Sequence, residues 1–363
     1  SATEDNGKIR LELSKPLKVA AKSLTHPYFS VVPKHVVLAH GKKWTSAKNL
    51  VTGGEYIVES TSKKRTVLKK NPHFKFLNQV TVDQIIHLHG KDGPKAKELF
   101  REGEVDFVAD TSSGKLHQMY PRNCVYYLSF NTGKESLGKV AVRQALAMMI
   151  PRTDLLESVN AGFEAKTFLQ PSLGSNEVAP YWWHLSDEEL AIEDSRLLEQ
   201  EGFTRANPLV FEYSFNRSMA HGRFANSIKR QWEETLPVKV SVSELDWAEH
   251  TEKYTQGDFE VARMGWCLDF PDQGDYLSLF TSTSQNNLTG WKSSEYDQLV
   301  AEGLNELDPV KSDQIYGEAV DILSQQMPAT PIYHFTRGFQ VSDQLVNFSY
   351  ENSLINTPYM VFK

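Results

Sequence analysis

One extended run of this chain combines residue types that could grip a ligand. Residues 260–269 read Glu-Val-Ala-Arg-Met-Gly-Trp-Cys-Leu-Asp, so an arginine, a glycine, a tryptophan and a cysteine precede an aspartate. In a strand of period 2, Arg263 and Gly265 share one face while Met264 and Trp266 share the other. A glycine beside a tryptophan lets another backbone approach an aromatic wall. The residues alone leave a second interpretation open, which is a core strand with one fixed arginine.

The sequence contains no complete pattern for catalysis or for metal binding. His87 and His89 alternate in a predicted strand, so their imidazoles share a face and could hold a metal, but no third ligand stands beside them. A Gly-x-Ser-x-Gly elbow, a Walker loop and a Gly-x-Gly-x-x-Gly fingerprint do not occur. We therefore expect a protein that is not an enzyme and that uses neither a metal nor a cofactor.

Length and charge limit the class of protein further. A chain of 363 residues is long enough for two or three domains, and its formal net charge is −7. Such a chain carries no overall basic field for nucleic acid or acidic lipid. No apolar stretch of the sequence approaches the roughly 18 residues of a membrane span. We therefore expect no nucleic-acid partner.

The segments around this run alternate between strands and amphipathic helices. Apolar spacing predicts strands over 66–68, 80–89, 209–215 and 238–245. It predicts helices over 94–101, 140–149 and 221–234, and a further helix that stops at Gly202. Strands that alternate with helices in this way favour an α/β layer.

Several motifs in a fixed order give the chain a resemblance to a known family. They are Cys-Val-Tyr-Tyr-Leu-Ser-Phe-Asn-Thr at 124–132, Val-Arg-Gln-Ala-Leu-Ala at 142–147, Pro-Arg-Thr-Asp-Leu-Leu at 151–156, Asn-Asn at 286–287, Ser-Ser-Glu-Tyr-Asp at 293–297 and Thr-Pro-Ile-Tyr at 330–333. Together with the 260–269 run, they make the chain resemble the periplasmic oligopeptide-binding proteins, which are extracellular solute-binding proteins of family 5. Members of this family are receptors of ATP-driven (ABC) importers. The resemblance extends from about residue 7 to residue 363.

The resemblance implies a fold class and a domain organisation. The expected fold is α/β and similar to type II periplasmic binding proteins, with two mixed-sheet lobes joined by a hinge. Residues 34–123 with 337–363 would form domain I, and residues 124–336 would form domain III, the ligand-binding lobe. Residues 1–33 would be a connector and a remnant of the family's small extra domain. Full receptors carry a long portion ahead of the point that matches residue 1, so most of the small domain is expected to be absent here. We expect the natural protein to be longer; the alternative is a degenerate form that cannot close around a peptide in the usual way.

The resemblance also implies roles for side chains at the two charged ends of a bound peptide, which lies extended beside a strand in this family. Position-matching implies that Asp269 binds the peptide ammonium and that Arg263 and His221 bind the peptide carboxylate. Backbone groups of Arg263, Gly265 and Cys267 would pair with the peptide. From the residues alone, Asp269 could instead organise a turn, and His221 could be a solvated or helix-capping residue.

The remaining site residues follow from the same resemblance. Trp247 and Trp266 would line side-chain pockets, although a lone tryptophan could equally be a core residue. A third cation of the family, a lysine, matches Asn160 here, which removes a contact for the shortest peptides. The two cysteines of the chain, Cys124 and Cys267, would form a disulfide and imply an oxidising compartment. Two buried free thiols are the alternative.

The implied function is that of the substrate-binding component of an ABC-type peptide importer. The protein would bind short peptides in extended form between two lobes and deliver them to a membrane permease. It would act as a monomer in the periplasm, or on a lipid anchor at the surface of a bacterium with a single membrane. Two alternatives remain open: a ligand-sensing module of the same fold in a regulator, and a receptor for a non-peptide solute.

Overall fold

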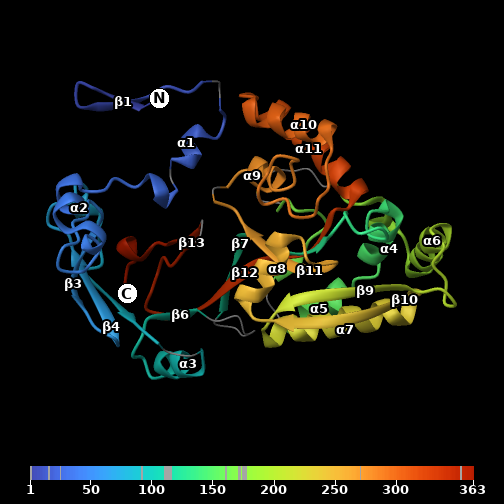
Figure 1. Cartoon of the computed structure of the whole chain (residues 1–363). Helices are drawn as coiled ribbons and strands as arrows, with labels where there is room; N and C mark the ends of the chain where they lie inside the picture. The colour runs from blue at the N-terminus through green and yellow to red at the C-terminus, as the bar shows by residue number, and fades with distance from the viewer. Residues whose placement is uncertain are drawn as a thin grey trace. The chain divides into compact units, whose positions relative to one another are not determined.

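The computed structural model describes residues 2–14, 17–24, 26–90, 93–109, 117–159, 162–170, 173, 178–269, 271–351 and 354–363. The chain forms two compact units (Figure 1). The large unit comprises Ser1–Leu24 and Asn123–Phe335, and the small unit comprises Thr25–Arg122 and Thr336–Lys363. The N-terminal segment groups with the large unit, where Lys18 and Lys22 donate to side chains of Ser312 and Asp272. The assignment of residues 1–33, 34–123 with 337–363, and 124–336 to separate family domains stays a prediction.

A mixed sheet forms the centre of the large unit, with the strand order β10–β9–β11–β7–β12 and with β8 paired to β12. Its strands are β7 (His117–Phe130), β8 (Gly162–Glu164), β9 (Leu209–Asn216), β10 (Val238–Leu245), β11 (Val261–Cys267) and β12 (Ala329–Val341). β9 runs parallel to β10 and β11, whereas β11 and β7 are antiparallel. Along β7, Tyr126 and Leu128 enter one hydrophobic core, and Val125 and Tyr127 enter a second. The sheet is therefore buried on both faces.

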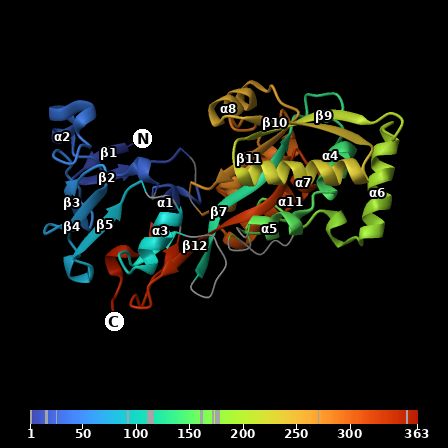
Figure 2. The same ribbon diagram turned by 90° about the horizontal axis from the view of Figure 1, so that it is seen from below.

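Helices pack against both faces of this sheet, and Figure 2 shows α7 lying along it. One core receives residues from α4 (Val140–Met148), α5 (Arg152–Val159), α6 (Asp187–Gln200) and α7 (Met219–Thr235). The other receives residues from α9 (Gln273–Ser278), α10 (Ser294–Asn305) and α11 (Pro309–Gln326). α8 (Trp247–Gln256) follows β10, and the N-terminal segment holds β1 (Ala2–Asp5), β2 (Lys8–Leu11) and α1 (Ala20–Ser23). None of the helices in the described part of the chain has the length and apolar character needed to span a bilayer.

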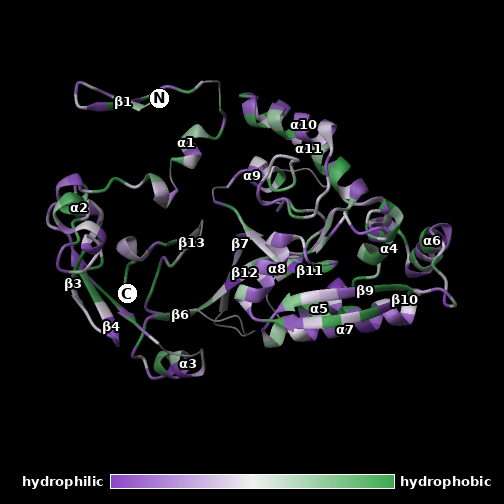
Figure 3. Cartoon of the chain, viewed as in Figure 1, coloured by the Kyte–Doolittle hydropathy of each residue, from purple (hydrophilic) through white to green (hydrophobic). Residues whose placement is uncertain are grey.

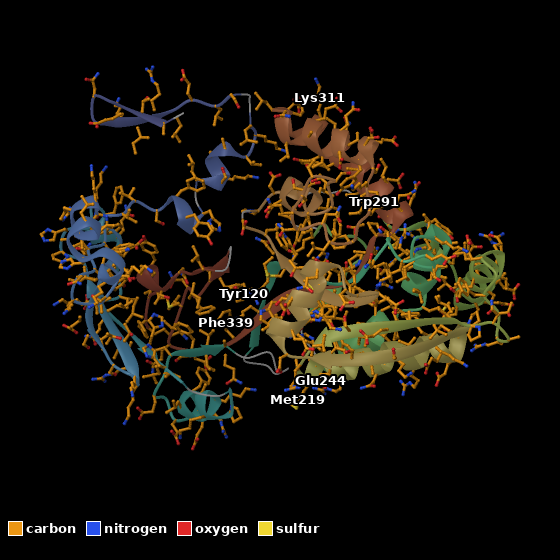
Figure 4. The ribbon with its side chains drawn as sticks, in the orientation of Figure 1. Tyr120, Met219, Glu244, Trp291, Lys311 and Phe339 are labelled. Carbon is orange, nitrogen blue, oxygen red and sulfur yellow. A yellow bond between two sulfur atoms is a disulfide. The ribbon has the colours of Figure 1, made fainter. Side chains whose placement is uncertain are left out.

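An antiparallel sheet and an aromatic cluster form the small unit. The sheet has the order β3–β4–β5, with β3 (Tyr56–Thr61), β4 (Arg65–Lys70) and β5 (Gln84–Leu88). The other elements are α2 (Lys34–His40), α3 (Gly93–Arg101), β6 (Phe107–Ala109), β13 (Tyr350–Glu351) and β14 (Leu354–Ile355). Phe339, Phe348 and Tyr350 form a core against which Tyr120 packs, with the Tyr120 and Phe339 ring centroids 6.1 Å apart (Figure 4).

The edge strand β10 has its free side partly covered by an ion pair from α7. The carbonyl oxygen of Pro237 accepts from Leu209 N in β9, and that of Leu245 accepts from Arg217 N just beyond β9. The odd-numbered residues of β10 therefore bond to β9. Val240 therefore faces the free edge, where its N–H donates to Glu233 Oε1 at 2.9 Å and its carbonyl accepts from Lys229 Nζ. Lys229 and Glu233 also pair with each other at 2.6 Å. The pair occupies backbone groups that an added strand would use.

We predict that this ion pair limits edge-to-edge association of the protein. The double substitution Lys229→Ala, Glu233→Ala frees both backbone groups of Val240, so the variant should form dimers or larger species as its concentration rises. Size-exclusion chromatography with light scattering measures this. The matched control is Lys95→Ala, Glu98→Ala, which removes an exposed ion pair from α3. Identical molecular masses for the two variants at every concentration would contradict the prediction.

Candidate functional site

The strand β11 has a neighbour along its whole length on one side only. Its antiparallel ladder with β7 runs from Val261 to Cys267. Its parallel pairing with β9 covers Val261 and Ala262 and then stops. Beyond Ala262, no other strand among the described residues pairs with that side. β11 thus has an open strand edge over residues 263–267.

Hydrogen bonds at the two ends of the β7 ladder show which residues face the open edge. Asn131 N donates to Glu260 O at 2.9 Å, and Leu268 N donates to Asn123 O at 2.8 Å. Hydrogen-bonded positions alternate in an antiparallel ladder, so the even-numbered residues of β11 bond to β7. The backbone groups of residues 263, 265 and 267 therefore point to the open edge, as the pairing expected for Arg263, Gly265 and Cys267 requires.

Two neighbouring features modify this edge. His250 Nε2 donates to the carbonyl oxygen of Arg263 at 2.8 Å, so that oxygen already has a partner. Gly265 has no side chain, and a Cβ at this position would lie 3.5 Å from Arg263 Nη2. The glycine thereby leaves space beside the guanidinium, and the backbone of Gly265 and Cys267 forms the rest of the edge.

A disulfide between Cys124 and Cys267 fastens β11 to β7. The two residues face each other in the ladder and are 143 positions apart in the sequence. This confirms the pairing that the resemblance implied. In the chain-entropy description, closing a loop of this size contributes at most about 5 kcal/mol to stability. The disulfide holds the C-terminal end of β11 in register with β7 and leaves the open edge free.

Arg263 is a buried cation that pairs with no carboxylate among the described residues. The residue is 9% exposed, its guanidinium carbon lies 4.6 Å from the centre of the Tyr126 ring, and Nη1 donates to Asn216 Oδ1 at 3.1 Å. Among the described residues it forms no ion pair, and its buried Nε has no hydrogen-bond partner. Because an unpaired buried charge is unfavourable, an anion that reached this guanidinium would be held strongly.

Other buried polar atoms near Arg263 also have no well-formed hydrogen bond to a described residue. They are the hydroxyl oxygens of Tyr126 and Tyr213 and the Nδ1 atom of His221. Burial raises the pKa of both tyrosines, and the positive charge of Arg263 acts against that rise. Both hydroxyls therefore stay protonated at neutral pH and can donate. The surroundings of Arg263 suit a negatively charged group.

His221 lies in the first turn of α7, half-buried beside Tyr126, with the two ring centroids 5.5 Å apart. Burial lowers the pKa of His221 to about 4, and the positive charge of Arg263 acts in the same direction. The imidazole is therefore uncharged at neutral pH and offers a hydrogen bond in place of a charge. Ser218, not His221, stands at the N-cap of α7, so His221 neither caps the helix nor lies free in solvent.

The other expected site residues lie elsewhere along β11 and α8. Asp269 is exposed two residues beyond β11, and its backbone N donates to Asp275 Oδ2 at 2.8 Å. Trp266 is half-buried against a hydrophobic core, whereas Trp247 is 57% exposed at the start of α8. The structure thus brings His221 to Arg263 and places Asp269 six residues further along, about 20 Å in an extended chain. Asn160 lies outside the described residues.

Sequence analysis missed the residues that position Arg263, which are Tyr126, Asn216 and His250. Asn216 ends β9 directly before α7, and a polar residue at the carboxyl end of a parallel strand is a usable sign of a site. Tyr126 gives no such sign because a tyrosine in an apolar strand usually indicates core. His250 contacts Arg263 only through the fold, since it lies on α8.

The paired histidines of the sequence lie at β5 in the small unit. His89 Nε2 lies 3.0 Å from Thr66 Oγ1 in the small unit, at hydrogen-bonding distance. In the described ranges, no group of three or more histidine, cysteine or acidic side chains is placed to hold a metal ion.

The unpaired charge of Arg263 leads to a prediction about stability without ligand. Arg263→Met removes the charge and keeps apolar volume, so the free energy of unfolding should rise by up to about 1 kcal/mol. Arg143→Met is the matched control, because Arg143 is also buried, at 1% exposed, but donates to the carbonyl oxygens of Leu137, Gly138, Gln326 and Met327. This control should lose about 3 kcal/mol or more. Chemical denaturation measures both, and similar losses would make Arg263 a structural residue.

Comparisons with known proteins agree with this geometry. The family model for bacterial extracellular solute-binding proteins, family 5 middle region, matches residues 2–287. The chain is 29% identical to the periplasmic oligopeptide-binding protein OppA of Salmonella typhimurium, over 97% of this chain and 68% of that protein. It is 26% identical to the probable deoxycholate-binding periplasmic protein YgiS of Escherichia coli, over 92% of this chain and 64% of that protein.

Solved structures show the same fold. The unliganded open form of the periplasmic murein tripeptide binding protein MppA superposes with a TM-score of 0.82 at 24% identity, covering 99% of this chain and 73% of that one. The expected type II periplasmic-binding-protein fold is thereby confirmed. With its family match over most of its length, the chain belongs to family 5 of the bacterial extracellular solute-binding proteins.

Proposed function

We propose that this protein is the substrate-binding component of an ABC-type importer and that it binds short peptides in extended form. The observation that carries the proposal is the open edge of β11, which has a buried unpaired cation near one end and an acid beyond the other. Every free peptide offers the matching groups: a carboxylate, an ammonium and a repeating backbone between them. A site that binds these groups accepts many sequences, because none of them belongs to a side chain. The similarity to an oligopeptide-binding relative supports this ligand class.

The positions of the charged residues define the direction and length of the bound peptide. With its carboxylate at Arg263 and His221 and its ammonium at Asp269, the peptide runs antiparallel to β11. A fully extended chain from Arg263 to Asp269 would span at most about 20 Å. The chain bends at Asp269, beyond the end of β11, so the actual span is shorter and peptides of about three to five residues fit best. Trp247 and Trp266 would then line pockets for the peptide side chains.

Location and partners form part of the same proposal. Relatives named as periplasmic and the disulfide both support a periplasmic protein, since disulfides persist in oxidising compartments. The protein would act as a monomer and deliver its ligand to a membrane permease. We propose no catalytic activity, because the family consists of solute-binding receptors.

A non-peptide solute is the second candidate ligand, favoured by the similarity to a protein named as probably deoxycholate-binding. Deoxycholate carries a carboxylate, which Arg263 could bind in the same way as a peptide end. It offers no ammonium for Asp269 and no backbone for the edge of β11. A sensor module in a regulator would use the same site, and no observation favours it over a transport receptor.

The role of Asp269 is tested by removing either the carboxylate charge of the protein or the ammonium charge of the peptide. Asp269→Asn should weaken binding of trialanine by about tenfold or more, because an ammonium held by a carboxylate loses a charge-assisted contact. Binding of N-acetyltrialanine should change little, since that peptide has no ammonium. Calorimetric titration gives the four affinities. Asp258→Asn is the control, an exposed acid of the same unit.

Three outcomes separate the candidate functions. A loss confined to trialanine supports the ammonium contact, whereas equal losses for both peptides would remove that role from Asp269. Binding of deoxycholate but of neither peptide would favour the non-peptide solute.

The pKa of His221 predicts how affinity depends on pH. In the free protein this pKa is lowered to about 4, chiefly by burial. A peptide carboxylate beside the imidazole stabilises its protonated form and raises the pKa, so binding takes up a proton. Affinity for trialanine should therefore increase as the pH falls from about 7 towards 5, while the peptide carboxylate stays ionised.

Calorimetry in buffers of different ionisation enthalpy measures the proton uptake directly. His221→Gln keeps a hydrogen-bonding group without a proton that titrates, so this variant should bind with little pH dependence over the same range. The same rise in affinity in both proteins would exclude His221 as its source.

A further inference from the structure

His221 lies on the face of helix α7 that is turned towards Arg263, and the opposite face of the helix carries further polar side chains. Its residues Phe224, Ala225, Ile228 and Trp232 are buried, and hydrophilic and hydrophobic stretches alternate along its ribbon (Figure 3). The outward positions Met219, Arg223, Ser227 and Arg230 line a hollow of about 910 Å³. Arg217 and Glu244, beside the ends of β9 and β10, complete it, and Figure 4 labels Met219 and Glu244 at this corner of the molecule.

The hollow, which we call the α7 groove, has an excess of positive charge. Arg217 is neutralised by Glu244 at 3.1 Å and by Asp246 at 3.0 Å. Arg223 and Arg230 are exposed and form no ion pair with any described residue. The whole chain has a net charge of −7, so this is a local cationic region on an acidic protein.

The stability of α7 does not explain these arginines. The first turn of the helix contains no acidic residue and the last turn no basic one, while Glu233 and Glu234 lie near its C-terminal end. Arg223 and Arg230 lie in neither terminal turn, so the helix dipole gives them little stabilising role. Both side chains are exposed, and Arg223 Nε donates at 3.4 Å to Met219 O of the same helix. Their charges are therefore accessible to a group outside the helix.

We propose that the α7 groove binds an acidic segment of a protein partner. Arg223 and Arg230 are seven residues apart, about 10 Å along the helix, which matches two carboxylates on one segment better than a single small anion. The planar guanidinium can grip each carboxylate with two hydrogen bonds. Ser227 lies between the arginines and can bond to the backbone of the segment, and Met219, 85% exposed, offers it an apolar contact.

Electrostatics favour this partner over a neutral or basic one. An acidic segment is repelled by most of this negatively charged protein and attracted by the α7 groove, which both orients and accelerates the encounter. The groove is also too large for one phosphate group to fill. The inference does not depend on the peptide-binding role of β11, because the groove uses a different face of α7.

A hexaglutamate peptide that is N-acetylated and C-amidated is the probe for the experiment. Its blocked ends remove the ammonium and the terminal carboxylate that the proposed β11 site binds. Titration calorimetry should show binding that weakens as salt rises from about 0.05 to 0.15 M, where the screening length is about 8 Å. The variant Arg223→Gln, Arg230→Gln should bind about tenfold more weakly, while Arg196→Gln, an exposed arginine of α6, should bind as the unchanged protein does.

The titration results either support or overturn the binding of an acidic protein segment in the α7 groove. Absence of hexaglutamate binding by the unchanged protein, or equal affinities for the unchanged protein and the double variant, would overturn it. Inorganic tripolyphosphate is the comparison ligand. Tighter binding of tripolyphosphate than of hexaglutamate through the same two arginines would assign the groove to phosphate groups and overturn the protein partner. Unchanged affinity for trialanine in the double variant checks that the fold and the β11 site are intact.

Discussion

The large unit contains a buried positive charge that no described residue neutralises, and the surrounding structure must offset its unfavourable burial. Arg263 stays buried because the face of Tyr126 and the amide of Asn216 receive its guanidinium, and no described carboxylate neutralises it. Such an arrangement lowers stability, and a well-packed protein tolerates it only where its remaining core is extensive. The two cores on opposite faces of the sheet provide that reserve. In the proposed function, this loss of stability is the cost of a cation that can hold the peptide carboxylate.

The strand β7 connects this charge to the rest of the fold. Tyr126 supplies the ring under Arg263 and packs in one core, while its neighbour Tyr127 packs in the other. Cys124 on the same strand bonds to Cys267, so β11 cannot shift its register against β7. The open edge of β11 is consequently a stiff surface, which reduces the entropy lost when a ligand strand binds to it.

Opposite faces of helix α7 border two regions of positive charge, which are the surroundings of Arg263 and the α7 groove. His221 turns towards Arg263 and Tyr126, whereas Arg223 turns outward into the α7 groove. Residues two positions apart on a helix do not face each other, so the two regions share the helix without sharing a side chain. The uncharged state of His221 also avoids placing a second cation beside Arg263 at neutral pH.

The sequence by itself determined much of the order of strands and helices, the family resemblance, and Arg263 as a candidate site residue. These follow from local periodicity and from motifs that are continuous in the chain. The pairing of Cys124 with Cys267 was implied only by the resemblance, and the structure confirmed it. Only the tertiary structure decided that Arg263 has no acidic partner within the described ranges, that Asn216 and His250 position it, and that no described strand pairs with the open edge of β11 beyond Ala262. The reason is physical: periodicity records which face of a strand is buried, whereas burial of a charge and divergence of two strands depend on residues far apart in sequence.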